Sequence, residues 1–208
     1  MKKIALSILS MICVLTLSAQ DIQLPEPVKT GGKPLMDCLS ERKTTRQFDA
    51  EREFDHQTLA NLLWAAWGFN RDDKRTAPSS RNKQEVDIYV AMKSGLYLWD
   101  AKNNTLQLKA PADLRSATAT QQGVADCSAV FIYVSNTDKI EGKNREELIA
   151  ATYANTGFIA QNVYLFCASE GLGAVIRAMI DKPVLWASMG LTGDQIILLA
   201  QSVGYPVN

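Results

Sequence analysis

The pattern of apolar and polar positions along the chain predicts a mixture of helices and strands. One segment, 56–68, carries apolar side chains at helical spacing on a single face: Leu59, Leu62, Leu63, Ala66 and Trp67. Asp55 before it and Gly68 at its end are residues that commonly cap a helix. The run 129–134 is continuously apolar, which is typical of a central strand buried on both faces.

The remaining elements follow from the same reasoning. We expect helices at 35–41, 113–122, about 144–170 and 181–189, and strands at 86–92, 174–176 and 195–203. Segments 96–99 and 105–108 flank a turn that contains asparagines, and they indicate a hairpin. Helices and strands mix without a regular βαβ period, so the sequence favours an α+β fold in one domain, over residues 35–208.

The first residues predict a secretory signal peptide over 1–19. A short basic start is followed by the apolar run 4–17 and by the small residues Ser18 and Ala19, which suit cleavage. A membrane anchor is the alternative, but the run is shorter than the roughly 18–20 residues needed to span a bilayer. We therefore expect export to the periplasm, with no stable membrane insertion after cleavage. Residues 20–34 contain three prolines and a Gly-Gly pair, which predict a flexible, exposed arm.

Composition and charge exclude several classes of function. The chain has 208 residues, of which 47% are hydrophobic and 21% charged, and its formal net charge is zero. That balance is typical of one globular domain, and it lacks the basic excess by which nucleic acid is bound. One histidine and four scattered cysteines have no spacing suited to a metal site, and a Ser-His-Asp hydrolase would depend on His56 alone. The cysteines left after signal cleavage are expected to be buried free thiols.

The segment 42–48, with the sequence RKTTRQF, is the first candidate for chemistry. Arg42 and Arg46 stand four residues apart with Thr44 between them, so two cations and a hydroxyl can grip a dianionic phosphate and neighbouring hydroxyl groups. Arginine suits this task because its planar group donates paired hydrogen bonds to phosphate oxygens. A solvated basic turn after a helix is the alternative interpretation.

Two further segments carry weaker signals. Residues 78–82, PSSRN, place a proline, two small hydroxyl residues and an asparagine in a loop that can approach a ligand closely. An ordinary surface turn has the same composition. Residues 155–175 combine a long helix that contains a glycine with a Gly-Leu-Gly turn into a strand, and generic packing explains this segment equally well.

Taken in this order, the three segments resemble the FMN-dependent nitroreductase-like oxidoreductases. The first is similar to that family's R-x-[ST]-x-[RK]-x-F motif, the second to its P-S-[SA]-x-N loop, and the third to its core helix and following turn. Gly204-Tyr205-Pro206 matches the family's terminal G-x-P turn. The resemblance implies a nitroreductase-like fold, with a central, mainly antiparallel sheet flanked by helices, and a homodimer that holds FMN at its interface.

The resemblance also implies the residues of a flavin site. FMN would be bound by the 42–46 segment, by the 78–82 loop of the partner subunit, by a glutamine at the pyrimidine edge of the ring and by main-chain amides near the ring atom N5. The residues so implied are Arg42, Lys43, Thr44, Arg46, Pro78, Ser79, Ser80, Asn82, Gln121, Ala178 and Met179. Many members of the family continue past the G-x-P turn to a basic residue that helps to hold the phosphate, whereas this chain stops at Asn208. Phosphate neutralisation would then rest on Arg42 and Arg46, with Arg177 as a further candidate.

The expected function is electron transfer through FMN between a small-molecule donor and acceptor. No metal or catalytic side chain is required, because the isoalloxazine ring carries the electrons. The hairpin around Tyr97-Leu98-Trp99 is similar to the branch of the family that includes the SagB-type dehydrogenases. Export conflicts with the usual NAD(P)H donor, since nicotinamide cofactors are scarce outside the cytoplasm, and the substrate stays open. The alternative function is a catalytically silent flavin-binding or scaffold protein of the cell envelope.

Overall fold

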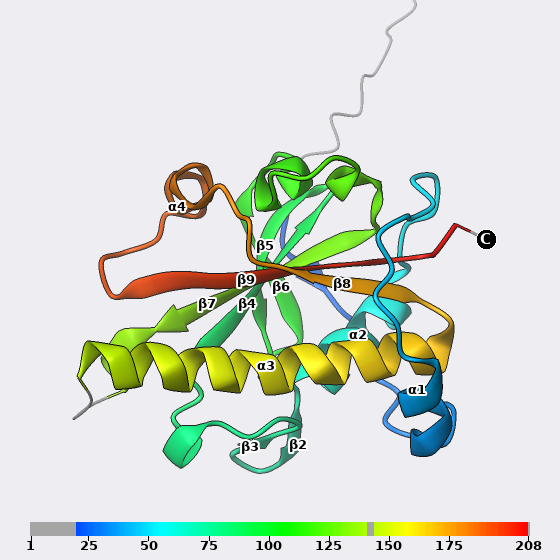
Figure 1. The fold of residues 1–208 in the computed structure, drawn as a ribbon, viewed down its shortest axis with the longest axis horizontal. Helices are drawn as coiled ribbons and strands as arrows, with labels where there is room; N and C mark the ends of the chain where they lie inside the picture. Colours follow the sequence, from blue (N-terminus) through cyan, green and yellow to red (C-terminus); the bar gives the residue numbers. More distant parts are fainter. Residues whose placement is uncertain (1–19, 141–143, 208) are drawn as a thin grey trace, which may run out of the picture.

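The computed structural model describes residues 20–140 and 144–207, which build a seven-stranded sheet with helices on both faces (Figure 1). The predicted signal peptide lies outside the described residues. Within them, no helix is both long and apolar enough to cross a membrane.

Every neighbouring pair of strands in the main sheet is antiparallel, in the order β1-β6-β5-β4-β7-β9-β8. These strands are β1 (Ile22–Gln23), β4 (Val86–Met92), β5 (Gly95–Asp100), β6 (Thr105–Ala110), β7 (Ala129–Asn136), β8 (Gly173–Arg177) and β9 (Gln195–Gly204). A separate small hairpin consists of β2 (Phe69–Arg71) and β3 (Lys74–Arg75). The long strand β9 lies between β7 and β8, so β8 forms one edge of the sheet.

Helices close both faces of this sheet. They are α1 (Leu35–Glu41), α2 (His56–Trp67), α3 (Arg145–Glu170) and α4 (Lys182–Met189), with short 3₁₀ turns η1 (Ser80–Asn82), η2 (Arg115–Thr118), η3 (Val124–Asp126) and η4 (Thr137–Lys139). Phe131 and Tyr133 of β7 pack in a core with α2 and α3, whereas Val130 and Ile132 pack in a second core with α4. Because successive strand residues face opposite sides, the continuous apolar run supplies both cores, and its prediction as a central strand is confirmed.

Local sequence explains where the helices begin and end. The Asp55 carboxylate accepts a hydrogen bond from the Thr58 amide at 2.6 Å, so the predicted N-terminal cap of α2 is confirmed. Gly171 ends α3 in the left-handed region, with φ 69°. Gly68 ends α2 in an extended conformation instead, and its lack of a side chain matters because a Cβ there would lie 2.3 Å from Trp64 Cδ1.

The predicted α+β fold class is confirmed, but one expected helix is wrong. Most of the expected arm, 20–34, is exposed, but part of it docks: β1 adds to the edge of the sheet beside β6, and Leu24 is only 3% exposed. The expected helix over 113–122 is limited to the 3₁₀ turn η2, after which the chain is irregular up to η3. The three cysteines of the described chain are buried free thiols, as predicted: Cys38, Cys127 and Cys167.

Candidate functional site

The segment 42–46 runs in an extended conformation beside β8. The Thr45 amide donates to the Ala174 carbonyl at 2.9 Å, and Phe48, 5% exposed, forms a bridge to Pro206. This close approach requires Gly173, because a Cβ there would lie 2.8 Å from Thr45 Cγ2. The sheet edge therefore fixes the path of the predicted phosphate-binding segment.

Because successive side chains of an extended segment point to opposite sides, Arg42 and Thr44 lie on one side and Lys43 on the other. The Arg42 guanidinium lies 5.5 Å from the centre of the Tyr164 ring, and Thr44 Oγ1 is 3.5 Å from the Tyr164 hydroxyl. That hydroxyl also accepts a hydrogen bond from the Ile176 amide of β8 at 2.9 Å. Tyr164 of α3 thus joins Arg42 and Thr44 to the edge strand. Sequence reasoning did not identify Tyr164 as part of the site, because nothing local marks a contact made across the fold.

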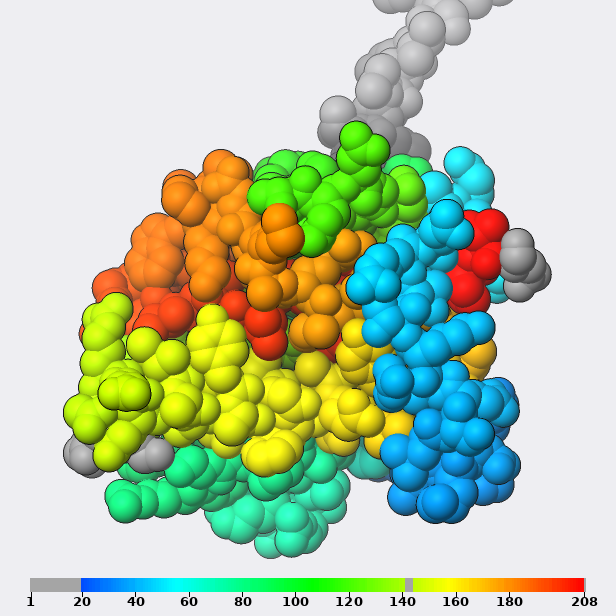
Figure 2. Space-filling model, in the orientation of Figure 1, coloured from blue at the N-terminus to red at the C-terminus, as the bar shows by residue number. Residues whose placement is uncertain are grey.

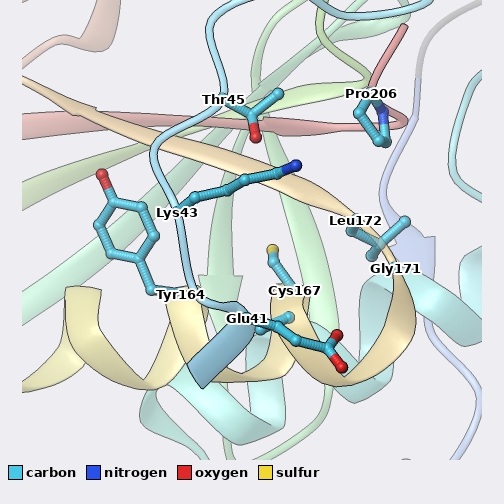
Figure 3. Close-up of a pocket in the computed structure, with 9 residues that line it drawn as sticks. Glu41, Lys43, Thr45, Tyr164, Cys167, Gly171, Leu172 and Pro206 are labelled. Atoms are coloured by element: carbon cyan, nitrogen blue, oxygen red, sulfur yellow. The ribbon is translucent and has the colours of Figure 1, made fainter. Parts of the chain in front are cut away.

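Lys43 lies apart from Arg42 and Thr44. Its side chain points toward Thr45 and Pro206 and away from the Tyr164 ring (Figure 3). It borders a cavity of about 370 Å³ that is also lined by Cys167 and Leu172. The structure therefore does not bring Lys43 together with the other cations of the segment.

A second group of predicted residues meets at the end of β8. Arg177, 6% exposed, donates from Nε to Ser202 Oγ at 3.1 Å and from Nη1 to Gln121 Oε1 at 2.9 Å. Gln121 Nε2 lies 3.4 Å from Met179 Sδ, and the Thr120 amide donates to the Met179 carbonyl at 3.0 Å. The structure therefore brings Gln121 and Met179 together, with Arg177 between them and the sheet.

The main-chain amides expected to serve a ligand are available. Ala178 and Met179 follow β8 directly, both are exposed, and Met179 is 61% exposed. Among the described residues, no acceptor takes a hydrogen bond from either amide. An unpartnered N–H beside the Gln121 side chain is a ready donor for a polar ligand.

The arginines of this region carry positive charge without a counterion. In the part of the chain that the structure describes, no carboxylate forms an ion pair with Arg42, Arg46 or Arg177. Burial, and repulsion from Arg46 as well, lower the pKa of Arg177, so these two charges act on each other. Uncompensated cations, a hydroxyl and free amides form a donor set suited to an anionic ligand with acceptor atoms along its length. FMN, with its phosphate and its ring carbonyls, fits this donor set.

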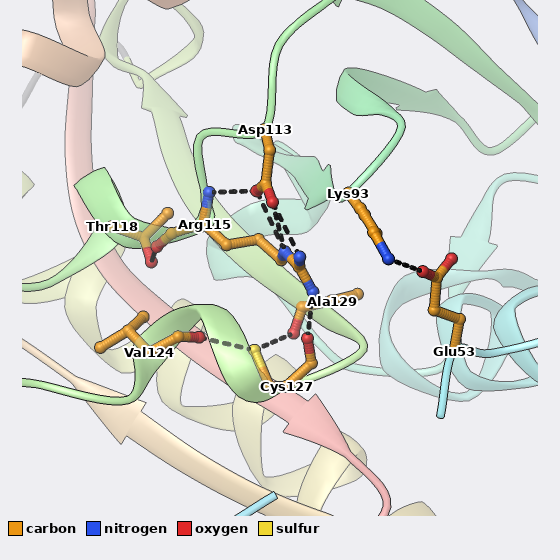
Figure 4. A network of polar contacts seen from close by, with 8 residues as sticks. All are labelled: Glu53, Lys93, Asp113, Arg115, Thr118, Val124, Cys127 and Ala129. Atoms are coloured by element: carbon orange, nitrogen blue, oxygen red, sulfur yellow. Dashed lines mark hydrogen bonds and ion pairs between the residues drawn. The ribbon is translucent and has the colours of Figure 1, made fainter. Parts of the chain in front are cut away.

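The loop that carries Gln121 is anchored by a buried arginine (Figure 4). Arg115 donates from Nη2 to Asp113 Oδ2 at 2.7 Å, from Nε to Asp113 Oδ1 at 3.0 Å, and from Nη1 to the Cys127 carbonyl at 2.6 Å. The Cys127 thiol donates to the carbonyls of Val124 and Ala129, and burial raises its pKa to about 11. Both ends of the loop are thereby fixed to the start of β7.

The loop 78–82 lies away from these groups. In Figure 1, η1 is on the opposite side of α3 from β8. Asn82, with φ 55°, donates from Nδ2 to the Asp73 carbonyl at 3.2 Å and accepts from Gln84 Nε2, while Ser79 Oγ accepts from the Gln84 amide. Pro78 and Ser80 make no side-chain hydrogen bond among the described residues. Within one chain, the two halves of the predicted site are not joined, and the polar groups of Asn82 hold its own loop together.

The antiparallel sheet with α3 packed across it is the nitroreductase fold. A Ralstonia eutropha protein of known crystal structure, named as a nitroreductase, is 38% identical, with a TM-score of 0.84 over 91% of this chain and 90% of that chain. A Staphylococcus epidermidis protein named as an NAD(P)H:FMN oxidoreductase, 14% identical, shares the fold with a TM-score of 0.65 over 88% and 92% of the two chains.

Sequence comparison agrees with the fold. A protein of Methanocaldococcus jannaschii named as a nitroreductase is 27% identical over 79% of this chain and 87% of that protein. The model of the nitroreductase family matches residues 39–205. This chain therefore belongs to the nitroreductase family and is an oxidoreductase.

Proposed function

We propose that this oxidoreductase binds FMN at the interface of a homodimer and passes electrons through it between a small-molecule donor and acceptor. The observation that carries the proposal is the set of donors along β8: Arg42 and Thr44 beside Tyr164, and Arg177, Gln121 and two unpartnered amides at the end of the strand, where Arg46 repels the Arg177 charge. Such a set satisfies both ends of FMN, an anionic phosphate and a ring edge that accepts hydrogen bonds.

The roles of the residues follow from their chemistry. Arg42 and Arg46, with the Thr44 hydroxyl, would hold the phosphate and the nearby hydroxyl groups. Gln121 and the Ala178 and Met179 amides would donate to the ring. Bound FMN supplies the electron-transfer chemistry, and the chain supplies position, hydrogen bonds and exclusion of water.

A second copy of the chain would complete the site. Figure 2 shows α1 and the stretch after β8 on the same face, with α3 running between them. Large apolar side chains are exposed on these elements, among them Met36 at 72%, Phe158 at 48% and Met179 at 61%. Exposed apolar side chains on these elements favour association, and the partner's 78–82 loop would supply the part of the site that one chain lacks. We expect a dimer in analytical ultracentrifugation, converted to monomer by Phe158→Glu; a monomeric unaltered chain would refute this part of the proposal.

The cofactor is tested with two neighbouring variants. Purified protein is expected to be yellow and to release FMN, identified by mass spectrometry. Arg42→Ala should weaken FMN binding by about 10- to 100-fold, because a phosphate loses a charged donor. Lys43→Ala is the matched control, since its side chain points toward Pro206, and it should change the affinity by less than about threefold. Colourless protein that fails to bind added FMN would overturn the proposal.

The electron donor and the export of the protein are proposals as well. Stopped-flow mixing of the FMN-loaded protein with NADH, NADPH and dithionite identifies the donor: export predicts slow reduction by both nicotinamides and fast reduction by dithionite. Stoichiometric FMN that no donor reduces would instead favour the silent flavin-binding protein.

Cell fractionation with N-terminal sequencing tests export directly, and a cytoplasmic protein that retains residues 1–19 contradicts it.

A further inference from the structure

The Arg177–Gln121 contact decides which way the Gln121 amide faces. A glutamine side chain can both donate and accept, whereas an arginine can only donate. Because Arg177 Nη1 lies 2.9 Å from one end of the amide, that end must be the oxygen Oε1. The other end, Nε2, then faces outward and is a donor.

Arg177 is itself held rigidly. Its side chain is buried, its Nε bonds to Ser202 Oγ at 3.1 Å, and Ser202 is fully buried in β9. Pairing of Arg177 with Ala200 fixes the backbone at the same point. Gln121, in contrast, is exposed, and its oxygen has no other donor among the described residues. The orientation of the amide therefore depends on the arginine.

The donor end of Gln121 is left free for a ligand. Its only hydrogen-bond partner among the described residues is Met179 Sδ at 3.4 Å, and a thioether sulfur is a weak acceptor. A carbonyl or anionic ring edge would replace that contact readily. We propose that Arg177 is a positioning residue that locks Gln121 as a hydrogen-bond donor toward the flavin ring and thereby raises the reduction potential of the bound cofactor. This inference rests on the proposed function.

The test separates positioning from direct action of the Arg177 charge. Arg177→Met and Gln121→Leu are each expected to weaken binding of reduced FMN about tenfold relative to oxidised FMN, which lowers the two-electron midpoint potential by about 30 mV. If Arg177 acts through Gln121, then Arg177→Met adds no further shift in the Gln121→Leu background. Arg177→Lys keeps a donor and should restore part of the shift.

Matched controls keep the outcome interpretable. Arg52→Met removes a cation whose guanidinium stacks 3.6 Å from the centre of the Tyr205 ring, so it should leave the potential unchanged. Gln121 is exposed, so Gln121→Leu is expected to fold even if Arg177→Met does not. If the single variant Gln121→Leu leaves the midpoint potential of bound FMN unchanged, that result by itself overturns the inference. A full additional shift from Arg177→Met in the double variant also overturns it, while FMN binding would still uphold the proposed function. An unaltered chain that binds no FMN overturns both.

Discussion

The buried ion pair that anchors the Gln121 loop should stabilise the protein far more than an exposed pair beside it. Figure 4 shows both: Arg115 with Asp113, and Lys93 with Glu53. The Arg115 side chain is 8% exposed, and its partner is 34% exposed. The other pair is 3.4 Å apart, with side chains 67% and 53% exposed. The perturbation is Arg115→Met, with Lys93→Met as the control.

The magnitude follows from the bonds that are lost. Arg115→Met leaves the Cys127 carbonyl without its donor in a residue that is 0% exposed, which costs about 1–3 kcal/mol. The two-pronged contact with Asp113 adds up to about 1 kcal/mol, because water can rehydrate that carboxylate in part. A total near 3 kcal/mol lowers the melting temperature of a chain of this size by roughly 6–12 °C. Lys93→Met should cost less than about 0.5 kcal/mol.

The pH dependence of this effect has a definite sign. Burial pulls the pKa of Asp113 upward, but hydrogen bonds from the Arg115 side chain and main chain outweigh it, so the pKa lies below its ordinary value. A carboxyl with a depressed folded pKa stabilises the protein above the unfolded value, near 4, and loses that contribution as the pH falls through the folded pKa. The difference in unfolding free energy between the unaltered chain and Arg115→Met, called the gap below, should therefore be larger at pH 7 than at pH 3.

Urea unfolding followed by tryptophan fluorescence at both pH values measures this gap. Equal destabilisation by Arg115→Met and Lys93→Met at pH 7 would refute the reasoning from burial. A gap that widens toward pH 3 would refute the assignment of the Asp113 pKa.

Three further perturbations test separate contacts. Gly173→Ala brings a Cβ to 2.8 Å from Thr45 Cγ2, so it should destabilise the fold by about 1–3 kcal/mol and weaken FMN binding; unchanged melting and affinity would show that the segment does not rest on β8. Asn155→Leu removes the 2.7 Å donor to the fully buried Glu85 carboxyl and should cost about 2 kcal/mol in urea unfolding, whereas a neutral result would mean that water reaches Glu85. Cys127, whose pKa is raised to about 11 by burial, should resist a maleimide at pH 8 in the native protein and react only in urea; rapid native labelling would contradict its burial.

The parts of the fold that local sequence determines were predictable. The continuous apolar run 129–134 needed a partner on each side, and it lies at the centre of the sheet with a core on each face. Asp55 predicted the start of α2, because a helix cap forms its hydrogen bond within the first turn. The arm was predictable only in part: its prolines indicated exposure, which most of 20–34 shows, but composition does not reveal that β1 pairs with β6 or that Leu24 packs in the core.

The candidate site was predictable in its members but not in its geometry. The first motif singled out Arg42 and Arg46, and the family resemblance implied Gln121. Among the described residues both arginines lack a counterion, and Gln121 lies beside a third arginine, Arg177. Lys43 belongs to the same motif, yet an extended backbone turns it to the other side, toward Pro206. The Arg177–Gln121 hydrogen bond joins residues 56 positions apart, so only the folded chain could reveal it.

Calorimetric titration of the apoprotein with FMN and with riboflavin at low salt tests most directly whether Arg42 and Arg46 recognise the phosphate of a flavin. The two ligands share the ring and differ in the phosphate. The structure predicts one FMN per chain, bound at least about tenfold more tightly than riboflavin, because charged donors to a phosphate contribute about 1.5–3 kcal/mol. Equal affinity for the two ligands, or no binding of either, would contradict the account.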